Sequence, residues 1–141
     1  MRVDIEKIRR KEEERILISC VEVTQDIDDI RNYALHKGTG LTGLTEQNHT
    51  ERFLLENVYY FEAIDEKVFA YTGKKVYEIK SRLYEVEKTY SAHRFVRCSK
   101  SVVVNLMLIA SISPALNGRF YAHMKNGEKL IISRQYAPFL R

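Results

Sequence analysis

The sequence predicts a mainly β fold with short helices, of the α+β class, in a chain of 141 residues. Short apolar runs rich in Val, Ile, Tyr and Phe follow one another after residue 50 and are separated by turn residues. Two Asn-Gly pairs, 117–118 and 126–127, lie between alternating apolar segments, and this pattern indicates type I′ β-hairpins. Few stretches have apolar residues at helical spacing. A hydrophobic share of 45% is sufficient for these elements to share a core.

The first 40 residues predict a small β-β-α unit. Arg2 to Ile8 and Ile16 to Val23 are strand candidates on either side of a charged stretch. Thr24 is placed to cap a helix that extends to Lys37. Such a unit is too small to bury a core alone, so we expect it to pack on the rest of the chain or on a second copy.

The polar segment from Gly38 to Thr50 is the best candidate for a boundary, and it divides the chain into residues 1–40 and 41–141. Ser81 is placed to cap a helix through Tyr90, and the end of the chain predicts a short helix over 134–140. Between the two Asn-Gly pairs, alternate residues face opposite sides of a strand. The other strands expected after the boundary are 52–55, 58–64, 67–72, 75–79, 95–98 and 109–113.

Charge is distributed unevenly along the chain. The formal net charge is +4, but from Arg94 to the end eight Lys or Arg face one acidic residue, Glu128, which gives 8 − 1 = +7. The first 93 residues therefore hold 15 − 18 = −3. Such segregation on strands and turns indicates a polyanion partner, and nucleic acid more than a membrane. No run of about 18 apolar residues is present and the charged N-terminus is not a signal peptide, so we expect a cytoplasmic protein.

The sequence has no pattern typical of an enzyme. It lacks a Gly-rich phosphate loop, a metal-binding cluster and a recognisable nucleophile set, so we expect neither catalysis nor a cofactor or metal. Cys20 and Cys98 do not make a disulfide framework. Cys98 lies beside two cations, which lower a thiol pKa, so a redox role and a buried strand cysteine both remain open. His93 and His123 have no partner at ligand spacing and are expected on the surface.

Five motifs in the second part of the chain resemble the LytTR DNA-binding domain of bacterial response regulators. They are Tyr60-Phe61-Glu62-Ala63, Leu83-Tyr84-Glu85-Val86-Glu87, the block from Phe95 to Asn105, Asn117-Gly118 and Ser133-Arg134. Their order and spacing fit the family pattern from Asn57 to Leu140. The resemblance implies a fold of small β-sheets that places loops, rather than a recognition helix, in successive major grooves of double-stranded DNA.

The resemblance also implies which residues contact DNA. It points to three loops, at 65–67, 99–101 and 133–134. Candidates for contact with bases are Lys67, Lys100 and Arg134, and candidates for phosphate contact or loop support are Arg97, Ser99, Ser101, Asn117 and Arg119. The alternative interpretation of Lys67, Lys100 and Arg134 is that they are ordinary solvated surface cations. The alternative for Arg97 is a structural ion pair. The family usually has His-Arg where this chain has Ser99-Lys100, and lysine lacks the bidentate fork of arginine, so we expect a different base preference there.

The function expected from these observations is sequence-specific binding of double-stranded DNA by a bacterial transcription regulator. An RNA-binding or ribosome-associated β protein is the alternative that the basic second half also suits. The stretch before the LytTR-like part is too short for the receiver that precedes it in response regulators. We therefore expect a stand-alone regulator in which residues 1–40 form the contact of a homodimer, and we expect no membrane partner.

Overall fold

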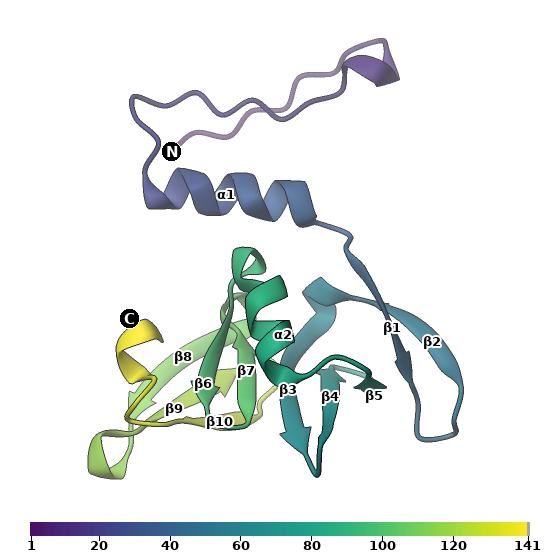
Figure 1. Cartoon of the computed structure of the whole chain (residues 1–141). Helices are drawn as coiled ribbons and strands as arrows, with labels where there is room; N and C mark the ends of the chain where they lie inside the picture. Colours follow the sequence, from purple (N-terminus) through teal and green to yellow (C-terminus); the bar gives the residue numbers. More distant parts are fainter. Residues whose placement is uncertain (141) are drawn as a thin grey trace.

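The computed structural model describes residues 1–140, with side chains described as far as Pro138. Two α-helices and ten β-strands make up the regular structure (Figure 1). The helices are α1 (Gln25–His36) and α2 (Leu83–Thr89). The strands are β1 (Gly40–Leu44), β2 (Thr50–Leu54), β3 (Val58–Ile64), β4 (Lys67–Thr72), β5 (Val76–Ile79), β6 (Phe95–Ser99), β7 (Val102–Asn105), β8 (Ile109–Pro114), β9 (Phe120–Met124) and β10 (Lys129–Ile132). Short 3-10 helices are η1 (Lys11–Glu13), η2 (Leu55–Asn57), η3 (Ser91–His93), η4 (Leu106–Leu108), η5 (Leu116–Gly118) and η6 (Ala137–Leu140).

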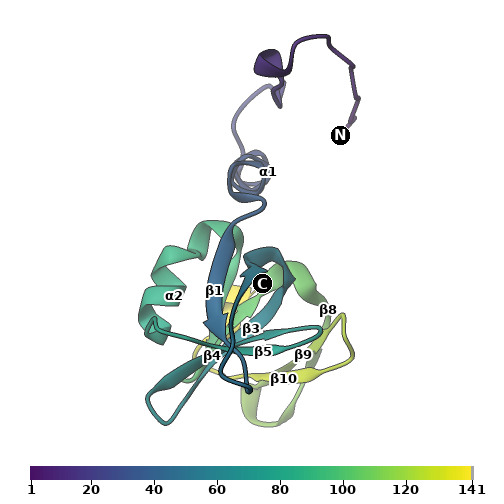
Figure 2. The same ribbon diagram turned by 90° about the vertical axis from the view of Figure 1, so that its right-hand side faces the viewer.

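The strands form two antiparallel sheets, which confirms the mainly β fold. Seven strands lie in the order β2-β1-β5-β4-β3-β7-β6, and three lie in the order β10-β9-β8. The large sheet has α2 on one face and the small sheet on the other (Figures 1 and 2). Phe61 and Val103 of its central strands pack toward α2, whereas Tyr60 and Val104 pack toward the small sheet. The centre of the large sheet is therefore covered on both faces.

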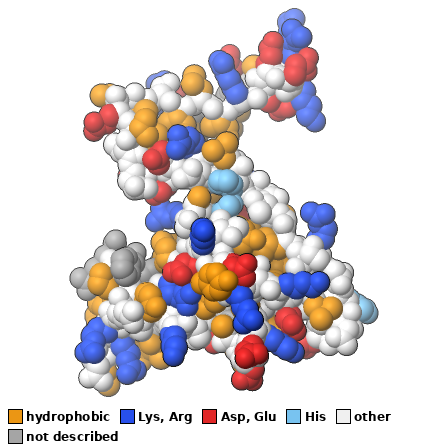
Figure 3. Space-filling view, viewed as in Figure 1, with side chains coloured by type: hydrophobic (Ala, Val, Ile, Leu, Met, Phe, Trp, Pro, Cys, Tyr) orange, Lys and Arg blue, Asp and Glu red, His pale blue; other side chains and the backbone are white. Residues whose placement is uncertain are grey.

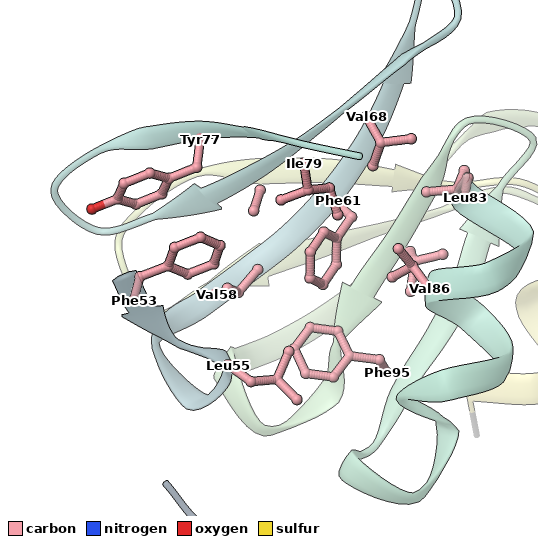
Figure 4. Close-up of a cluster of buried hydrophobic side chains, with 12 residues drawn as sticks. Phe53, Leu55, Val58, Phe61, Val68, Tyr77, Ile79, Leu83, Val86 and Phe95 are labelled. Atoms are coloured by element: carbon pink, nitrogen blue, oxygen red, sulfur yellow. The ribbon is translucent and has the colours of Figure 1, made fainter. Parts of the chain in front are cut away.

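The larger core lies between α2 and the seven-stranded sheet (Figure 4). Leu83 and Val86, three residues apart on α2, are the helix residues that the sheet buries. The ring of Phe61 lies 5.5 Å from that of Phe95, and both side chains are buried. At Gly43 an added Cβ would lie 2.6 Å from the Cβ of Tyr77, so only glycine lets β1 approach β5 this closely.

The second core joins the two sheets and includes a polar link. The Tyr60 hydroxyl donates to Glu128 Oε2 at 2.8 Å, and the Tyr71 hydroxyl donates to Glu62 Oε1 at 3.1 Å. The two tyrosine rings stack with centroids 4.4 Å apart. Burial first, and then the nearby carboxylates, raise the pKa of Tyr71 to about 12. Glu128, the only acidic residue after position 93, thus ties the β9–β10 turn to the large sheet.

Helix α1 lies apart from the sheets, at the end of the molecule opposite the β3–β4 and β8–β9 connections (Figures 1 and 2). Thr24 caps it as predicted, because its side chain accepts from the Ile27 N–H at 3.4 Å. Two contacts hold α1 to the segment after α2. Arg94 Nη1 lies 3.0 Å from Asp29 Oδ2, and the rings of His36 and His93 lie 4.3 Å apart. The expectation that His93 and His123 lie on the surface is wrong for both, since each side chain is half-buried.

Residues 1–23 form no β-strand, so the two strands expected in an N-terminal β-β-α unit are wrong for the single chain. The only regular element in this stretch is η1, and Val3, Ile5, Leu17 and Val21 are exposed. The physical reason is the lack of a neighbour, because an isolated two-stranded hairpin is marginally stable and neither sheet pairs with this segment. The division into residues 1–40 and 41–141 stays a prediction.

Candidate nucleic-acid interface

Four connections lie side by side and form a surface that we call the loop face, defined as residues 65–67, 99–101, 115–119 and 133–136. The first three, which join β3 to β4, β6 to β7 and β8 to β9, lie at the end of the molecule opposite α1 (Figure 1). The fourth follows β10. All of the residues predicted to contact DNA fall within the loop face, except Arg97, which lies in β6 two residues before it; Lys67 and Ser99 are the strand residues that border the connections.

The β3–β4 connection is a two-residue turn at Asp65 and Glu66. Their φ values are 49° and 67°, so both adopt the left-handed conformation that type I′ hairpins require. Lys67 begins β4 and pairs with Ile64 in the ladder. Its Nζ lies 3.8 Å from Glu78 Oε1, and 60% of its side chain is exposed. An exposed pair of this kind is weak, so Lys67 remains available to a polyanion.

The β6–β7 connection is supported from behind by Arg97. Its Nη1 donates to the Lys100 carbonyl at 2.6 Å, and its Nη2 donates to Glu87 Oε1 of α2 at 3.3 Å. Only 15% of the Arg97 side chain is exposed, whereas Lys100 is exposed at the turn. The Ser99 hydroxyl accepts from the Ser101 N–H at 3.4 Å, and both serines are half-buried. These contacts support the interpretation of Arg97 as an ion-paired residue that holds the loop, and its role toward DNA stays a prediction.

Backbone hydrogen bonds join this connection to its neighbours. The Ala63 N–H donates to the Ser101 carbonyl, and the Ser133 N–H donates to the Cys98 carbonyl, each at 2.8 Å. Cys98 is fully buried, and burial raises the pKa of its thiol to about 12. Thiolate is therefore scarce at neutral pH, which supports the buried strand cysteine over the redox role.

The β8–β9 connection supports Arg134. Asn117 and Gly118 have φ values of 61° and 75°, inside a three-residue loop that the Ala115 N–H closes by donating to the Arg119 carbonyl at 2.9 Å. A Cβ built on Gly118 would lie 3.0 Å from Arg134 Cδ, so the stem of Arg134 lies directly over this glycine. The sequence did not reveal this contact, because the two residues belong to separate connections.

The second Asn-Gly pair adopts another turn. Only Gly127 has a positive φ, of 90°, and its N–H donates to the Met124 carbonyl at 3.0 Å. The Met124 N–H donates to the Glu128 carbonyl at 2.8 Å, which closes a three-residue loop. A type I turn followed by a left-handed glycine has this pattern, so the type I′ prediction is wrong here, although a hairpin forms.

The loop face carries more basic than acidic side chains. Its exposed ions are the cations Lys67, Lys100, Arg119 and Arg134 and the anions Asp65 and Glu66, for a formal charge of 4 − 2 = +2. Figure 3 shows Lys and Arg side chains over the β8–β9 connection. Cations held at fixed positions on loops suit a phosphate backbone, which they bind with release of counterions.

Among residues 1–140 no group of three or more His, Cys, Asp or Glu side chains is placed to hold a metal ion. None of the helices described there has the length and apolar character needed to cross a membrane.

Comparison with known proteins identifies the type of domain. Residues 48–141 match the family described as the LytTr DNA-binding domain. An uncharacterized HTH-type transcriptional regulator of Staphylococcus aureus (strain NCTC 8325 / PS 47) is 34% identical over 87 residues, which cover 62% of this chain and 58% of that protein. The sensory transduction protein LytT of Bacillus anthracis is 31% identical over 87 residues, which cover 62% of this chain and 35% of that protein. The matched part thus spans well under two thirds of either relative.

A solved structure agrees with the sequence matches. It is the LytTr DNA-binding domain of a Bacillus cereus protein described as a methyl-accepting/DNA response regulator, with a TM-score of 0.67 and 29% identity. The match covers 72% of this chain and 93% of that domain. In the described part of this chain α1 and α2 are separated by five strands and form no helix-turn-helix pair, although the S. aureus relative carries that term in its name. The extent of the family match and the shared fold lead to one conclusion: this chain belongs to the LytTr DNA-binding domain family.

Proposed function

We propose that this protein binds double-stranded DNA in a sequence-specific manner with its loop face and acts as a bacterial transcription regulator in the cytoplasm. The loop face is the observation that carries the proposal, because it presents exposed cations on connections held by backbone hydrogen bonds and by Arg97. Membership of a DNA-binding family supports duplex DNA as the partner. No enzymatic step and no cofactor is part of this function.

The side chains of the loop face suit different roles. Arg134 projects from the connection after β10, and a guanidinium can contact guanine O6 and N7 together. Lys100 sits at the tip of the β6–β7 turn and supplies a point charge within reach of bases or phosphates. We assign Arg134, Lys100 and Lys67 to base contact, and Asn117, Arg119, Ser99 and Ser101 to phosphate contact. Arg97 acts on DNA only through the loop that it supports.

Selection of binding sites from random duplex DNA, followed by fluorescence anisotropy on the selected site, tests the proposal. Arg134→Ala and Lys100→Ala should each weaken specific binding by about 1–3 kcal/mol, or about 5- to 150-fold in Kd. Lys88→Ala removes the same kind of charge from an exposed position of α2, outside both the loop face and residues 1–40, and should bind like the wild type. Variants at both loop positions that bind the selected site as tightly as wild type would contradict the assignment.

A competition experiment separates duplex DNA from the alternative RNA partner. Unlabelled selected duplex should displace the labelled site at concentrations near its own Kd. Single-stranded RNA of the same length should displace it only at much higher concentration, because the loop face lacks an exposed aromatic platform of the kind that stacks unpaired bases. RNA that competes as well as the selected duplex would support the alternative function instead.

We also propose that residues 1–40 form the contact of a homodimer. Ile30, Tyr33 and Leu35 of α1 are exposed, and so are most apolar side chains of residues 1–23. This surface lies at the end of the molecule opposite most of the loop face, so a dimer formed through it leaves both loop faces free for two half-sites. Analytical ultracentrifugation across the micromolar range tests the dimer, and a strict monomer would contradict it.

A further inference from the structure

We propose that residues 2–8 and 16–23 become β-strands only when two copies of this chain pair, so that folding of this segment and dimerisation are a single event. The inference rests on the proposed homodimer and specifies how that dimer is built. The partner it requires is a second copy of the same N-terminal segment.

In the single chain these residues have the composition of strands but the exposure of a disordered tail. The relative exposures of Ile5, Leu17 and Val21 are 92%, 72% and 107%. A contiguous set of exposed aliphatic side chains on a soluble domain commonly marks an interaction surface. The apolar side chains of this segment therefore gain no burial free energy in the monomer, and their burial can stabilise association instead.

Residues 16–23 have apolar side chains on both faces of the expected strand. Side chains on a strand alternate, so Ile16, Ile18 and Cys20 share one face, with Glu22 near the end of the segment. Leu17, Val21 and Val23 share the other face with Ser19. A strand with two apolar faces belongs inside a sandwich of layers rather than at a water-exposed surface. Helix α1 of the same chain supplies one apolar layer, and a second copy is needed for the other.

Strand number explains why one chain is not enough. A hairpin of two strands is marginally stable in water, whereas three or more strands with an apolar face can be stable. Two copies of residues 2–8 and 16–23 supply four strands, which is sufficient for a sheet. In the single chain, residues 2–8 and 16–23 form no strands, as expected for an isolated two-stranded hairpin.

The charge of residues 1–23 favours a second copy of this segment over a partner with a strong net charge. Residues 1–23 hold six basic side chains and six acidic ones, so the segment has a formal charge of 6 − 6 = 0. Two copies therefore do not repel each other, and opposite charges can face each other across neighbouring strands. A nucleic acid or a strongly charged protein would find no net attraction in this segment.

The two cysteines provide a built-in probe for this event. Cys20 lies in the segment and is exposed in the single chain, whereas Cys98 is fully buried with the pKa of its thiol raised to about 12. Ellman's reagent should therefore modify Cys20 and leave Cys98 unreacted in the folded protein. The Cys20→Ser variant, which should not react until it is unfolded, establishes this assignment.

The test compares Cys20 reactivity with oligomeric state in the full-length chain. As protein concentration rises, the reaction rate of Cys20 should fall in proportion to the fraction of monomer seen in sedimentation, because only the monomer exposes the thiol. Far-ultraviolet circular dichroism should gain strand signal over the same concentrations. Val21→Asp should remain monomeric with a reactive Cys20, since a buried unpaired carboxylate is costly in the dimer and costs nothing on the exposed monomer.

A matched control and distinct outcomes make the test decisive. Tyr84→Asp places the same charge at an exposed position of α2 and should dimerise like the wild type. A dimer in which Cys20 reacts as fast as in the monomer would overturn coupled folding and leave the dimer standing. A strict monomer would overturn both. Neither result bears on the proposed DNA binding, which is measured separately by anisotropy on a single half-site.

Discussion

Replacement of Arg97 by methionine separates loop support from direct contact with DNA. Methionine keeps an unbranched stem but removes the guanidinium that joins the Lys100 carbonyl to Glu87. A hydrogen bond from a charged donor contributes about 1.5–3 kcal/mol, and the pair with the half-exposed Glu87 adds under about 1 kcal/mol. The Lys100 carbonyl can take water instead, and the buried Arg97 Nε, which has no hydrogen-bond partner, is removed as well. We therefore expect a loss of about 1–2 kcal/mol of stability, or about 2–8 °C in Tm.

The same change should weaken DNA binding without changing its salt dependence. If binding must reorder about one loop residue, the added entropy cost is about 1–2 kcal/mol, which corresponds to about 5- to 30-fold in Kd. Arg97 does not reach the phosphates in this interpretation, so the slope of log K against log salt stays at the wild-type value. Lys100→Ala should leave Tm unchanged, because this side chain is exposed at the turn, and should weaken specific binding by about 1–3 kcal/mol.

Thermal melts and anisotropy titrations at several salt concentrations measure both quantities on the same two variants. An unchanged Tm for Arg97→Met would show that the observed hydrogen bonds do not support the loop. A slope reduced by about one for Arg97→Met would show that this side chain contacts phosphate directly. Either result would refute the assignment of Arg97 to loop support.

Three further outcomes follow from the structure. Gly118→Ala should reduce specific DNA binding more than Gly127→Ala, because both glycines have positive φ but only Gly118 lies against Arg134; equal effects in anisotropy would contradict this contact. Phe61→Ala should lower the free energy of unfolding in urea by about 3–5 kcal/mol, since its ring is fully buried, and a loss under 1 kcal/mol would place the ring outside the core. Burial, and then His36, lower the pKa of His93 from its usual 6.5, so the unfolded chain binds the proton more tightly and stability is lost as pH falls through 6.5. In melts between pH 5.5 and 7.5, the neutral variant His93→Gln should lose less Tm on acidification, and an identical loss would rule out this origin.

The strands with clear alternation could be predicted from the sequence, and two others could not. The bounds of β3 and β4 agree with the prediction, because turn residues and alternating apolar side chains mark both ends. The sequence of strand β1 predicts part of a polar boundary instead, since Gly40 and Gly43 have low strand propensity. Tertiary packing determines the strand conformation of this segment, because β1 lies in close contact with β5.

Strand β7 was missed for the opposite reason. All four of its residues are buried, because α2 covers one face of the large sheet and the small sheet covers the other. Such a strand has no polar alternation to reveal it. The helix cap also differed, since Arg82 rather than Ser81 precedes α2 and its N–H bonds to Glu85.

The candidate site was predictable as a set of loops but not as a connected surface. The family resemblance pointed to 65–67, 99–101 and 133–134, and the structure brings them together through the Ala63–Ser101 and Ser133–Cys98 hydrogen bonds. These bonds join residues far apart in sequence, and no local pattern encodes them. The roles of the individual side chains in DNA contact stay predictions.

The short connection between α1 and β1 has a consequence for cooperativity. Three residues, 37–39, separate the end of α1 from the start of β1, and one of them is Gly38 with a φ of 82°. In the proposed dimer, a domain that binds one half-site would hold its twin at an effective concentration on the order of millimolar near the next. So short a tether also restricts reach, so moving the half-sites apart by half a helical turn should abolish the gain in avidity, and a full turn should restore part of it.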